Sequence, residues 1–242
     1  MGMPITIDVR DAAVLERTFE EVFDELVRID RLFSPFLADS AVSRINAGTL
    51  RPGEAGPLIA EVIARCRGYE VETGGYFSAW AGGRFDPSGL VKGWALARAC
   101  AILDLHGHRD YFVDGAGDVR TRGESEPGTP WRVGVRHPVE RDKVVRVVVA
   151  SDLAVATSGT YEKGAHIVDP HTGRPATALV SLTVVGPDIV AADVYATAAF
   201  AMGLAGLAFV EGRPGYEAYA IEPTLRGSWT TGFDALCAPE AS

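Results

Sequence analysis

An aspartate and a threonine lie four residues apart in an otherwise apolar stretch, Ala192-Asp193-Val194-Tyr195-Ala196-Thr197-Ala198-Ala199-Phe200. In an α-helix, residues i and i+4 lie on the same face, so Asp193 and Thr197 can point at one ligand. A hard cation such as Mg²⁺ takes oxygen ligands and is usually held by one or two carboxylates together with substrate phosphates. The alternative is local hydrogen bonding, in which Asp193 caps the backbone and Thr197 bonds back to a carbonyl. The spacing alone leaves both interpretations open.

A glycine-bearing turn leads into a predicted helix at Asp86-Pro87-Ser88-Gly89-Leu90-Val91-Lys92-Gly93. Such a turn lets the backbone approach a ligand closely, and the free N–H groups of a first helical turn attract anions. Lys92 can add positive charge, and the Val91 carbonyl can face a cation. An ordinary capped helix start explains this motif equally well. A second glycine turn, Asp114-Gly115-Ala116-Gly117-Asp118, by itself favours a hairpin.

The densest group of reactive side chains lies in Thr157-Ser158-Gly159-Thr160-Tyr161-Glu162 and in His166-Ile167-Val168-Asp169-Pro170-His171-Thr172-Gly173. His166 is the best candidate for a general base because imidazole titrates near neutral pH. The alternative for His166 is a hydrogen bond to nearby backbone. A Ser-His-Asp hydrolase with Ser158 as nucleophile is disfavoured, since the chain lacks the glycine that a nucleophile elbow requires two residues before the serine.

Composition limits the class of protein. The 242 residues are 47% hydrophobic, which is enough for one large domain or two lobes that share a core. A net charge of −9 without a basic stripe argues against a nucleic-acid or anionic-membrane surface. The three cysteines show no paired spacing, which disfavours a zinc site or a disulfide framework. Charged residues interrupt positions 1–30, and the apolar run 194–210 is too short for a membrane span, so we expect a cytoplasmic protein without a signal peptide or transmembrane segment.

The elements that must position these motifs alternate unevenly along the chain. Hydrophobic periodicity predicts helices over 11–32, 57–73, 92–105 and 188–210, and a short helix that Ser40 caps and that ends near 46–48. Strands are predicted over 5–9, 111–113, 131–136, 144–149, 153–156, 166–168, 179–185, 216–221 and 228–231. This order favours an α+β fold over regular βαβ alternation. We expect a single domain over 1–242, with a central, mostly antiparallel, strand-rich core flanked by helices.

Six motifs occur in the order found in one known family. They cover residues 36–46, 86–93, 115–118, 157–162, 166–173 and 192–197. On these motifs the chain resembles the FAD:protein FMN transferase (ApbE-like) family, and the resemblance runs from the opening Met1-Gly2-Met3 to about Gly203. Six motifs in sequence order are highly specific, whereas any one of them is not.

The resemblance implies an activity. Members of the family bind FAD and Mg²⁺, cleave the pyrophosphate, and join FMN through a phosphoester to a threonine or serine hydroxyl of a target flavoprotein, with release of AMP. Some members also hydrolyse FAD. The alternatives for this chain are therefore an FAD pyrophosphatase that yields FMN and AMP, and a non-catalytic flavin-binding protein.

The resemblance also implies a set of site residues. The Asp193 and Thr197 side chains and the Val91 carbonyl would hold Mg²⁺. His166 and Asp118 would be catalytic, with His166 as the base for the incoming hydroxyl. The implied FAD-binding residues are Ser40, Ser43, Asn46, Lys92, Gly117, Asp118, Ser158, Tyr161, His166 and Ile167.

Three positions depart from the family pattern. Ala116 stands where the family usually has glycine, Pro87-Ser88 replaces a Leu-Gly type pair, and Met3 replaces a threonine. The first two changes alter turn flexibility but leave the polar groups in place. The aromatic side chains of Tyr76, Phe77 and Trp80 can stack on a flavin or adenine ring, although core packing is the commoner role of such residues.

Overall fold

The computed structural model describes residues 2–11, 14–140, 142–160 and 167–239. Among these residues the main sheet has seven strands in the order β1-β2-β3-β7-β10-β11-β12, and every neighbouring pair is antiparallel. The strands are β1 (Ile5–Val9), β2 (Tyr111–Gly115), β3 (Asp118–Arg122), β7 (Ala154–Gly159), β10 (Ser181–Gly186), β11 (Glu217–Ile221) and β12 (Gly227–Trp229).

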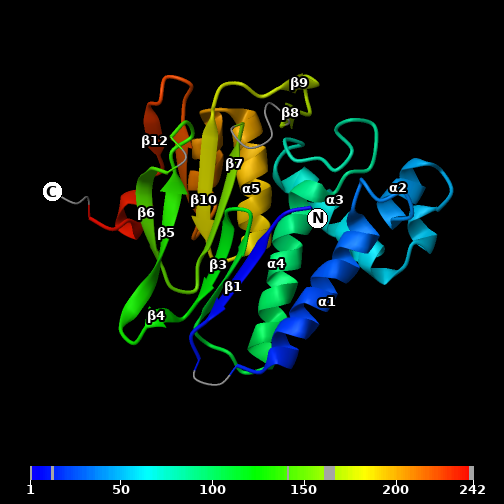
Figure 1. Ribbon diagram of the computed structural model, residues 1–242. Helices are drawn as coiled ribbons and strands as arrows, with labels where there is room; N and C mark the ends of the chain where they lie inside the picture. The colour runs from blue at the N-terminus through cyan, green and yellow to red at the C-terminus, as the bar shows by residue number, and fades with distance from the viewer. Residues whose placement is uncertain (1, 12–13, 141, 161–166, 240–242) are drawn as a thin grey trace.

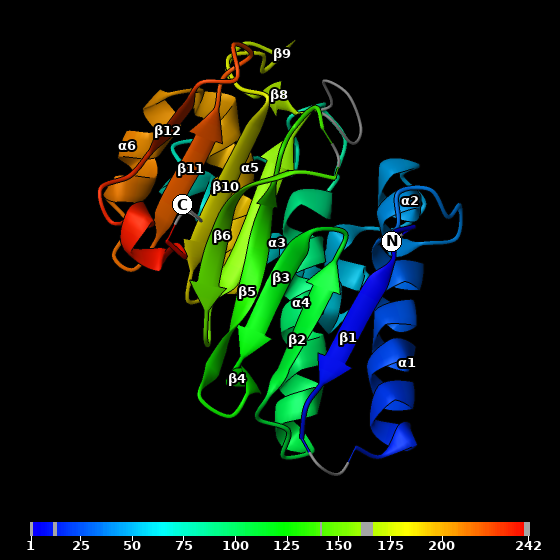
Figure 2. The same ribbon diagram turned by 60° about the vertical axis from the view of Figure 1, so that its left-hand side comes forward.

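Helices cover one face of this sheet. Figures 1 and 2 show α1 (Glu16–Phe33), α4 (Ser88–Leu105) and α5 (Ile189–Met202) packed against it, with α3 (Pro57–Glu72) and α2 (Ala41–Asn46) farther out. The short η1 (Pro52–Glu54) follows α2, and α6 (Ala205–Glu211) follows α5. Leu182 and Val184 of β10 belong to the core between the sheet and the helices. Burial of this apolar surface is the main force that holds α4 and α5 against the sheet.

A smaller sheet of β4 (Glu124–Glu126), β5 (Thr129–Arg136) and β6 (Val144–Ala150) covers part of the opposite face. Val135 and Val148 from this sheet form a second core with Val155, Val185 and Phe233. Phe233 opens the short helix η2 (Phe233–Leu236). Val184 and Val185 of β10 therefore face different cores, as expected for a strand that is buried on both sides.

The predicted fold class is confirmed, whereas two predicted helix starts and one strand differ from the structure. The first helix begins at Glu16 instead of residue 11, and α4 begins at Ser88, four residues before the prediction. The helical region predicted over 188–210, whose apolar run 194–210 is expected from its two glycines to form a buried helix pair, divides into α5 and α6 at Gly203, which adopts a positive φ of 67°. The strand β3 was not predicted, since its start was interpreted as the end of a turn.

The glycine turn at 114–118 is a hairpin, as the sequence predicted. Its two-residue loop, Ala116 and Gly117, has φ of 53° and 94°, so both residues lie in the left-handed region that a type I′ turn requires. The Gly117 amide also donates to Oδ1 of Asp114 at 2.7 Å. This turn places Asp118 at the first position of β3.

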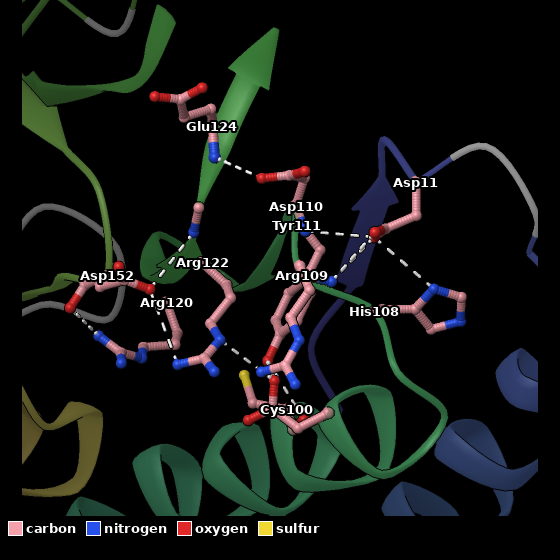
Figure 3. A network of polar contacts seen from close by, with 12 residues as sticks. Asp11, Cys100, His108, Arg109, Asp110, Tyr111, Arg120, Arg122, Glu124 and Asp152 are labelled. Atoms are coloured by element: carbon pink, nitrogen blue, oxygen red, sulfur yellow. Dashed lines mark hydrogen bonds and ion pairs between the residues drawn. The ribbon is translucent and has the colours of Figure 1, made fainter. Parts of the chain in front are cut away.

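A polar network ties the chain together at the end of the sheet away from the β8–β9 ribbon, which comprises β8 (Val168–Asp169) and β9 (Arg174–Pro175) (Figures 1 and 3). Asp11 accepts hydrogen bonds from the amides of Arg109 and Asp110, at 3.0 and 3.1 Å from Oδ2. Asp110 in turn accepts from the Glu124 amide at 2.8 Å. These bonds join the end of β1 to the start of β2 and to β4.

Candidate functional site

Two helices that come unusually close carry the polar centre of the site. A Cβ added to Gly93 on α4 would lie 2.7 Å from the Ile189 carbonyl oxygen and 3.1 Å from Cβ of Asp193 on α5. Only glycine leaves room for this approach. The closeness lets the Gly93 amide donate to Oδ2 of Asp193 at 2.9 Å.

A cavity of about 630 Å³ opens beside this contact. Its volume falls within the range of small-molecule and cofactor sites, about 300–1,000 Å³. Its wall comes from the segment before α4, the first turns of α4, the end of β7, the β8–β9 ribbon and α5. The lining residues are Tyr76, Phe77, Ser78, Ala79, Ala81, Gly82, Arg84, Asp86, Ser88, Gly89, Lys92, Ala116, Thr157, Ser158, Gly159, Ile167, Val168, Pro170, Gly173, Asp193 and Thr197.

Asp193 is the buried carboxylate of the cavity, with 2% of its surface exposed. Oδ2 accepts the Gly93 hydrogen bond, and Oδ1 lies 3.4 Å from Nζ of Lys92. Burial raises the pKa of Asp193 to about 7, because desolvation penalises the charged form more than the nearby Lys92 favours it. A bound cation would favour the charged carboxylate at this position.

Lys92 also pairs with a second buried carboxylate. Its Nζ lies 2.5 Å from Oδ2 of Asp118, whose Oδ1 accepts the Thr157 amide at 3.0 Å. Burial lowers the pKa of Lys92, but the charges of Asp193 and Asp118 outweigh that effect, so this pKa lies above its ordinary value. Lys92 is therefore a protonated amine between two carboxylates.

Thr197 follows Asp193 by one helical turn, and its side chain lines the same cavity. Its Oγ1 lies 3.3 Å from Oγ of Ser158 at the end of β7. A Cβ added to Gly89 would come within 3.8 Å of the Thr197 Oγ1, so the first turn of α4 lies against the Thr197 side chain. The structure thus brings Asp193, Thr197, Ser158 and Lys92 together at one cavity.

The oxygen atoms of Asp193 and Thr197 suit a hard cation, which also takes phosphate oxygens. Val91 lies in the first turns of α4 and has 3% of its surface exposed, and it is not among the cavity-lining residues. The described part of the chain contains no group of three or more His, Cys, Asp or Glu side chains suited to a metal. Among the described residues, a cation beside Asp193 would therefore find mainly neutral oxygens such as the Thr197 hydroxyl.

The sequence was compared with models of known protein families. The model of the ApbE family matches residues 1–84 and 80–220. The chain belongs to the ApbE family.

Among curated members of the ApbE family, the FAD:protein FMN transferase of Vibrio cholerae serotype O1 is 34% identical over 128 residues, which cover 49% of this chain and 38% of the relative. The FAD:protein FMN transferase of Escherichia coli K12 is 31% identical over 146 residues, which cover 56% of this chain and 42% of the relative. The chain thus spans about two fifths of the length of the curated relatives it matches.

Solved structures of ApbE proteins share the fold over nearly the whole chain. The flavin transferase ApbE from Vibrio cholerae superposes with a TM-score of 0.87 at 23% identity and covers 98% of this chain and 96% of its own. The ApbE protein from Thermotoga maritima gives a TM-score of 0.83 at 25% identity, with 97% and 96% covered.

Three residues predicted to bind FAD make hydrogen bonds within the chain of this ApbE-family protein and do not line the cavity. Ser40 caps α2, where it accepts from the Ser43 amide at 3.0 Å. Asn46 donates to the carbonyl of Phe85 and accepts from its amide, both at 2.8 Å. Asn46 therefore holds the segment that leads into α4, so the structure gives it a supporting position next to the site.

The remaining predicted residues fall into two groups. Ile167 lines the cavity, while Gly117 sets the turn whose other residue, Ala116, lines it. Tyr161 and His166 lie outside the described residues. The role of His166 as a base therefore stays a prediction.

The sequence interpretation missed Arg84 as a cavity residue. A charged side chain in the glycine-rich run just before Asp86 was an available signal. Tyr76 and Phe77 line the cavity, whereas Trp80 packs against Phe85 with ring centroids 5.1 Å apart.

Proposed function

We propose that this chain is an Mg²⁺-dependent FAD:protein FMN transferase. It cleaves the pyrophosphate of FAD, attaches FMN through a phosphoester to a threonine or serine hydroxyl of an acceptor flavoprotein, and releases AMP. The observation that carries the proposal is the meeting of Asp193 and Thr197 with Lys92 in one cavity of an ApbE-family fold. The curated relatives described above are named FAD:protein FMN transferases.

In this proposal, some residues of the cavity hold Mg²⁺ and others contact FAD. Mg²⁺, when bound, supplies positive charge beside the pyrophosphate. Asp193 and Thr197 would hold it, together with the Val91 carbonyl predicted from the sequence. The ring of Tyr76 lies on the cavity wall, where it can pack against a ring of the ligand. Arg84 adds positive charge to the same wall and can bind a phosphate oxygen.

The acceptor hydroxyl must lose a proton as it attacks phosphorus. His166 is the base in this proposal, and a positioned base typically contributes about 10²–10⁴-fold to the rate. The FMN phosphorus gains the acceptor oxygen as the bond to the AMP oxygen breaks, so AMP leaves with the electron pair of that bond. Positioning and charge stabilisation dominate phosphoryl transfer, so the cavity wall matters as much as the base.

A cytoplasmic location and a cytoplasmic acceptor remain part of the proposal. In the part of the chain that the structure describes, no helix is long and apolar enough to cross a membrane. The cysteines at 66, 100 and 237 are free thiols, as the absence of paired spacing predicted.

Incubation of the purified protein with FAD, MgCl₂ and a flavoprotein that carries a candidate threonine or serine site tests the proposal. Covalent fluorescent flavin on the denatured acceptor, together with AMP in solution, is the expected result. Free FMN and AMP without labelled acceptor would identify an FAD pyrophosphatase instead. Intact FAD bound to the protein would identify a flavin carrier. A parallel reaction with EDTA should form neither AMP nor labelled acceptor.

A further inference from the structure

Lys92 lies against two buried carboxyl groups, an arrangement that binding of FAD phosphate alone does not require. Its side chain is 27% exposed, whereas the side chains of Asp118 and Asp193 are 1% and 3% exposed. Each carboxylate uses one oxygen for a backbone amide, of Thr157 for Asp118 and of Gly93 for Asp193. The other oxygen of each carboxylate faces the Lys92 ammonium. The three side chains form a closed group of two carboxyl groups and one ammonium.

The two contacts of the ammonium are unequal. Nζ is 2.5 Å from Oδ2 of Asp118 but 3.4 Å from Oδ1 of Asp193. The first distance is that of a close ion pair, whereas the second is longer than a charge-assisted hydrogen bond. The ammonium of Lys92 therefore contacts Asp118 closely and Asp193 more distantly.

Oδ1 of Asp193 faces the Lys92 ammonium, whereas Oδ2 already accepts the Gly93 hydrogen bond, so we assign Oδ1 as the oxygen offered to a divalent cation. Two cations are then drawn to one oxygen. An ammonium on a flexible four-carbon stem can shift its contact, unlike the fixed fork of an arginine. The ion pair with Asp118 would hold the Lys92 ammonium after it moves away from Asp193.

We propose that Lys92 is the resident counter-cation of Asp193 in the metal-free protein, and that Asp118 retains the ammonium when Mg²⁺ takes Oδ1. The inference rests on the proposed function for the identity of the metal position. Lys92 keeps the empty cavity from holding two uncompensated buried carboxylates, whose desolvation is costly. It does so at the expense of metal affinity. Asp118 is then a positioning residue that acts through Lys92.

Binding of Mn²⁺ and Mg²⁺ to the FAD-free full chain, measured by calorimetry, tests this. The Lys92→Met variant should bind the metal about tenfold more tightly or better, since a unit charge close to the site no longer opposes it. Asp118→Asn should bind more weakly, because the freed ammonium moves onto Asp193. The double variant should regain affinity relative to Asp118→Asn. Lys143→Met is the matched control, because Lys143 is an exposed lysine paired with Glu140, and its affinity should be unchanged.

A second readout avoids variants that fold poorly. The chain has three lysines, so side-chain ¹⁵N labelling gives few signals, and Lys92→Met assigns one of them. Mg²⁺ should shift the Lys92 ammonium signal of the unaltered protein with the same dissociation constant that calorimetry gives. Unchanged or weaker metal binding by Lys92→Met, or a Lys92 signal that stays fixed at saturating Mg²⁺, overturns the proposal. Because FAD is absent, failure of FMN transfer in the acceptor assay would count against the proposed function and not against this inference.

Discussion

The backbone amide of Gly93 donates a 2.9 Å hydrogen bond to Oδ2 of Asp193, although the two residues are 100 positions apart in the chain. This bond joins α4 to α5 at the point where their backbones come closest. It orients the carboxylate so that Oδ1 faces Lys92. The packing of two helices and the chemistry of the cavity therefore depend on the same glycine.

Gly93→Ala should disrupt both the packing and the site. The new Cβ would meet the Ile189 carbonyl at 2.7 Å, which is closer than a carbon can approach, so the helices must separate. We expect a loss of about 1–3 kcal/mol in the free energy of unfolding, measured by urea titration, as for overpacking in other cores. Metal binding should weaken as well.

Gly68→Ala is the matched control, because Gly68 also lies within a helix but has no atom within 4 Å of an added Cβ. There the substitution should stabilise the protein by up to about 1 kcal/mol, since alanine favours a helix more than glycine does. Equal effects of the two substitutions would contradict the close-approach argument.

Asn46→Ala should loosen the segment that leads into α4 and forms part of the cavity wall. It removes both hydrogen bonds to the Phe85 backbone and leaves a buried amide and carbonyl without partners, which costs about 1–3 kcal/mol. FAD affinity, followed by flavin fluorescence, should fall in parallel with stability. Thr49→Ala removes one exposed hydrogen bond from the same region and should change stability by less than about 0.5 kcal/mol. If Asn46→Ala lowers stability as expected but leaves FAD affinity unchanged, then Asn46 does not support the FAD-binding part of the cavity wall.

Glu25 gives the fold a pH-dependent contact between α1 and α4. Hydrogen bonds from Arg28 and Arg98, together with their charges, outweigh burial and lower the pKa of Glu25. Because the folded pKa lies below the unfolded one, this contact stabilises the fold above the unfolded pKa and is lost as pH falls through the folded pKa. Glu25→Gln should therefore cost about 1 kcal/mol at pH 7, and the difference should vanish in acid.

Urea titrations of both proteins from pH 7 down to acid measure this difference. Glu20→Gln, at an exposed position on the same helix, is the control and should show no such dependence. A Glu25→Gln difference that stays constant with pH would assign the effect to lost packing.

The sequence predicted the Asp193 and Thr197 pair correctly as neighbours on one helix face, because helical spacing alone determines that geometry. The order of helices and strands was also largely readable from hydrophobic periodicity. The partners of Asp193 were not readable. Lys92, Asp118 and Gly93 meet it only through the packing of α4, β3 and α5, which no local pattern encodes.

Asn46 shows the same limit. The motif predicts a ligand contact for Asn46, which stays a prediction, but it gives no sign that the Asn46 side chain bonds to backbone 39 positions away. The start of α4 was missed because Asp86-Pro87 resembles the end of a loop. In the structure Asp86 accepts from the Ser88 amide at 3.0 Å, and the helix begins at Ser88 with Pro87 at the N-cap position.

The most direct measurement of the central claim is the rate of AMP release from FAD as a function of Mg²⁺ for the unaltered protein, Asp193→Asn and Asp188→Asn. Asp188 caps the same helix, where its Oδ1 accepts from the Ala191 amide at 2.8 Å, and it does not line the cavity. The account predicts saturable Mg²⁺ dependence, a loss of at least about 10²-fold in Asp193→Asn from lost charge stabilisation, and near-normal release by Asp188→Asn once its lower stability is allowed for. AMP release that Asp193→Asn leaves unchanged, or that proceeds equally in EDTA, would contradict it.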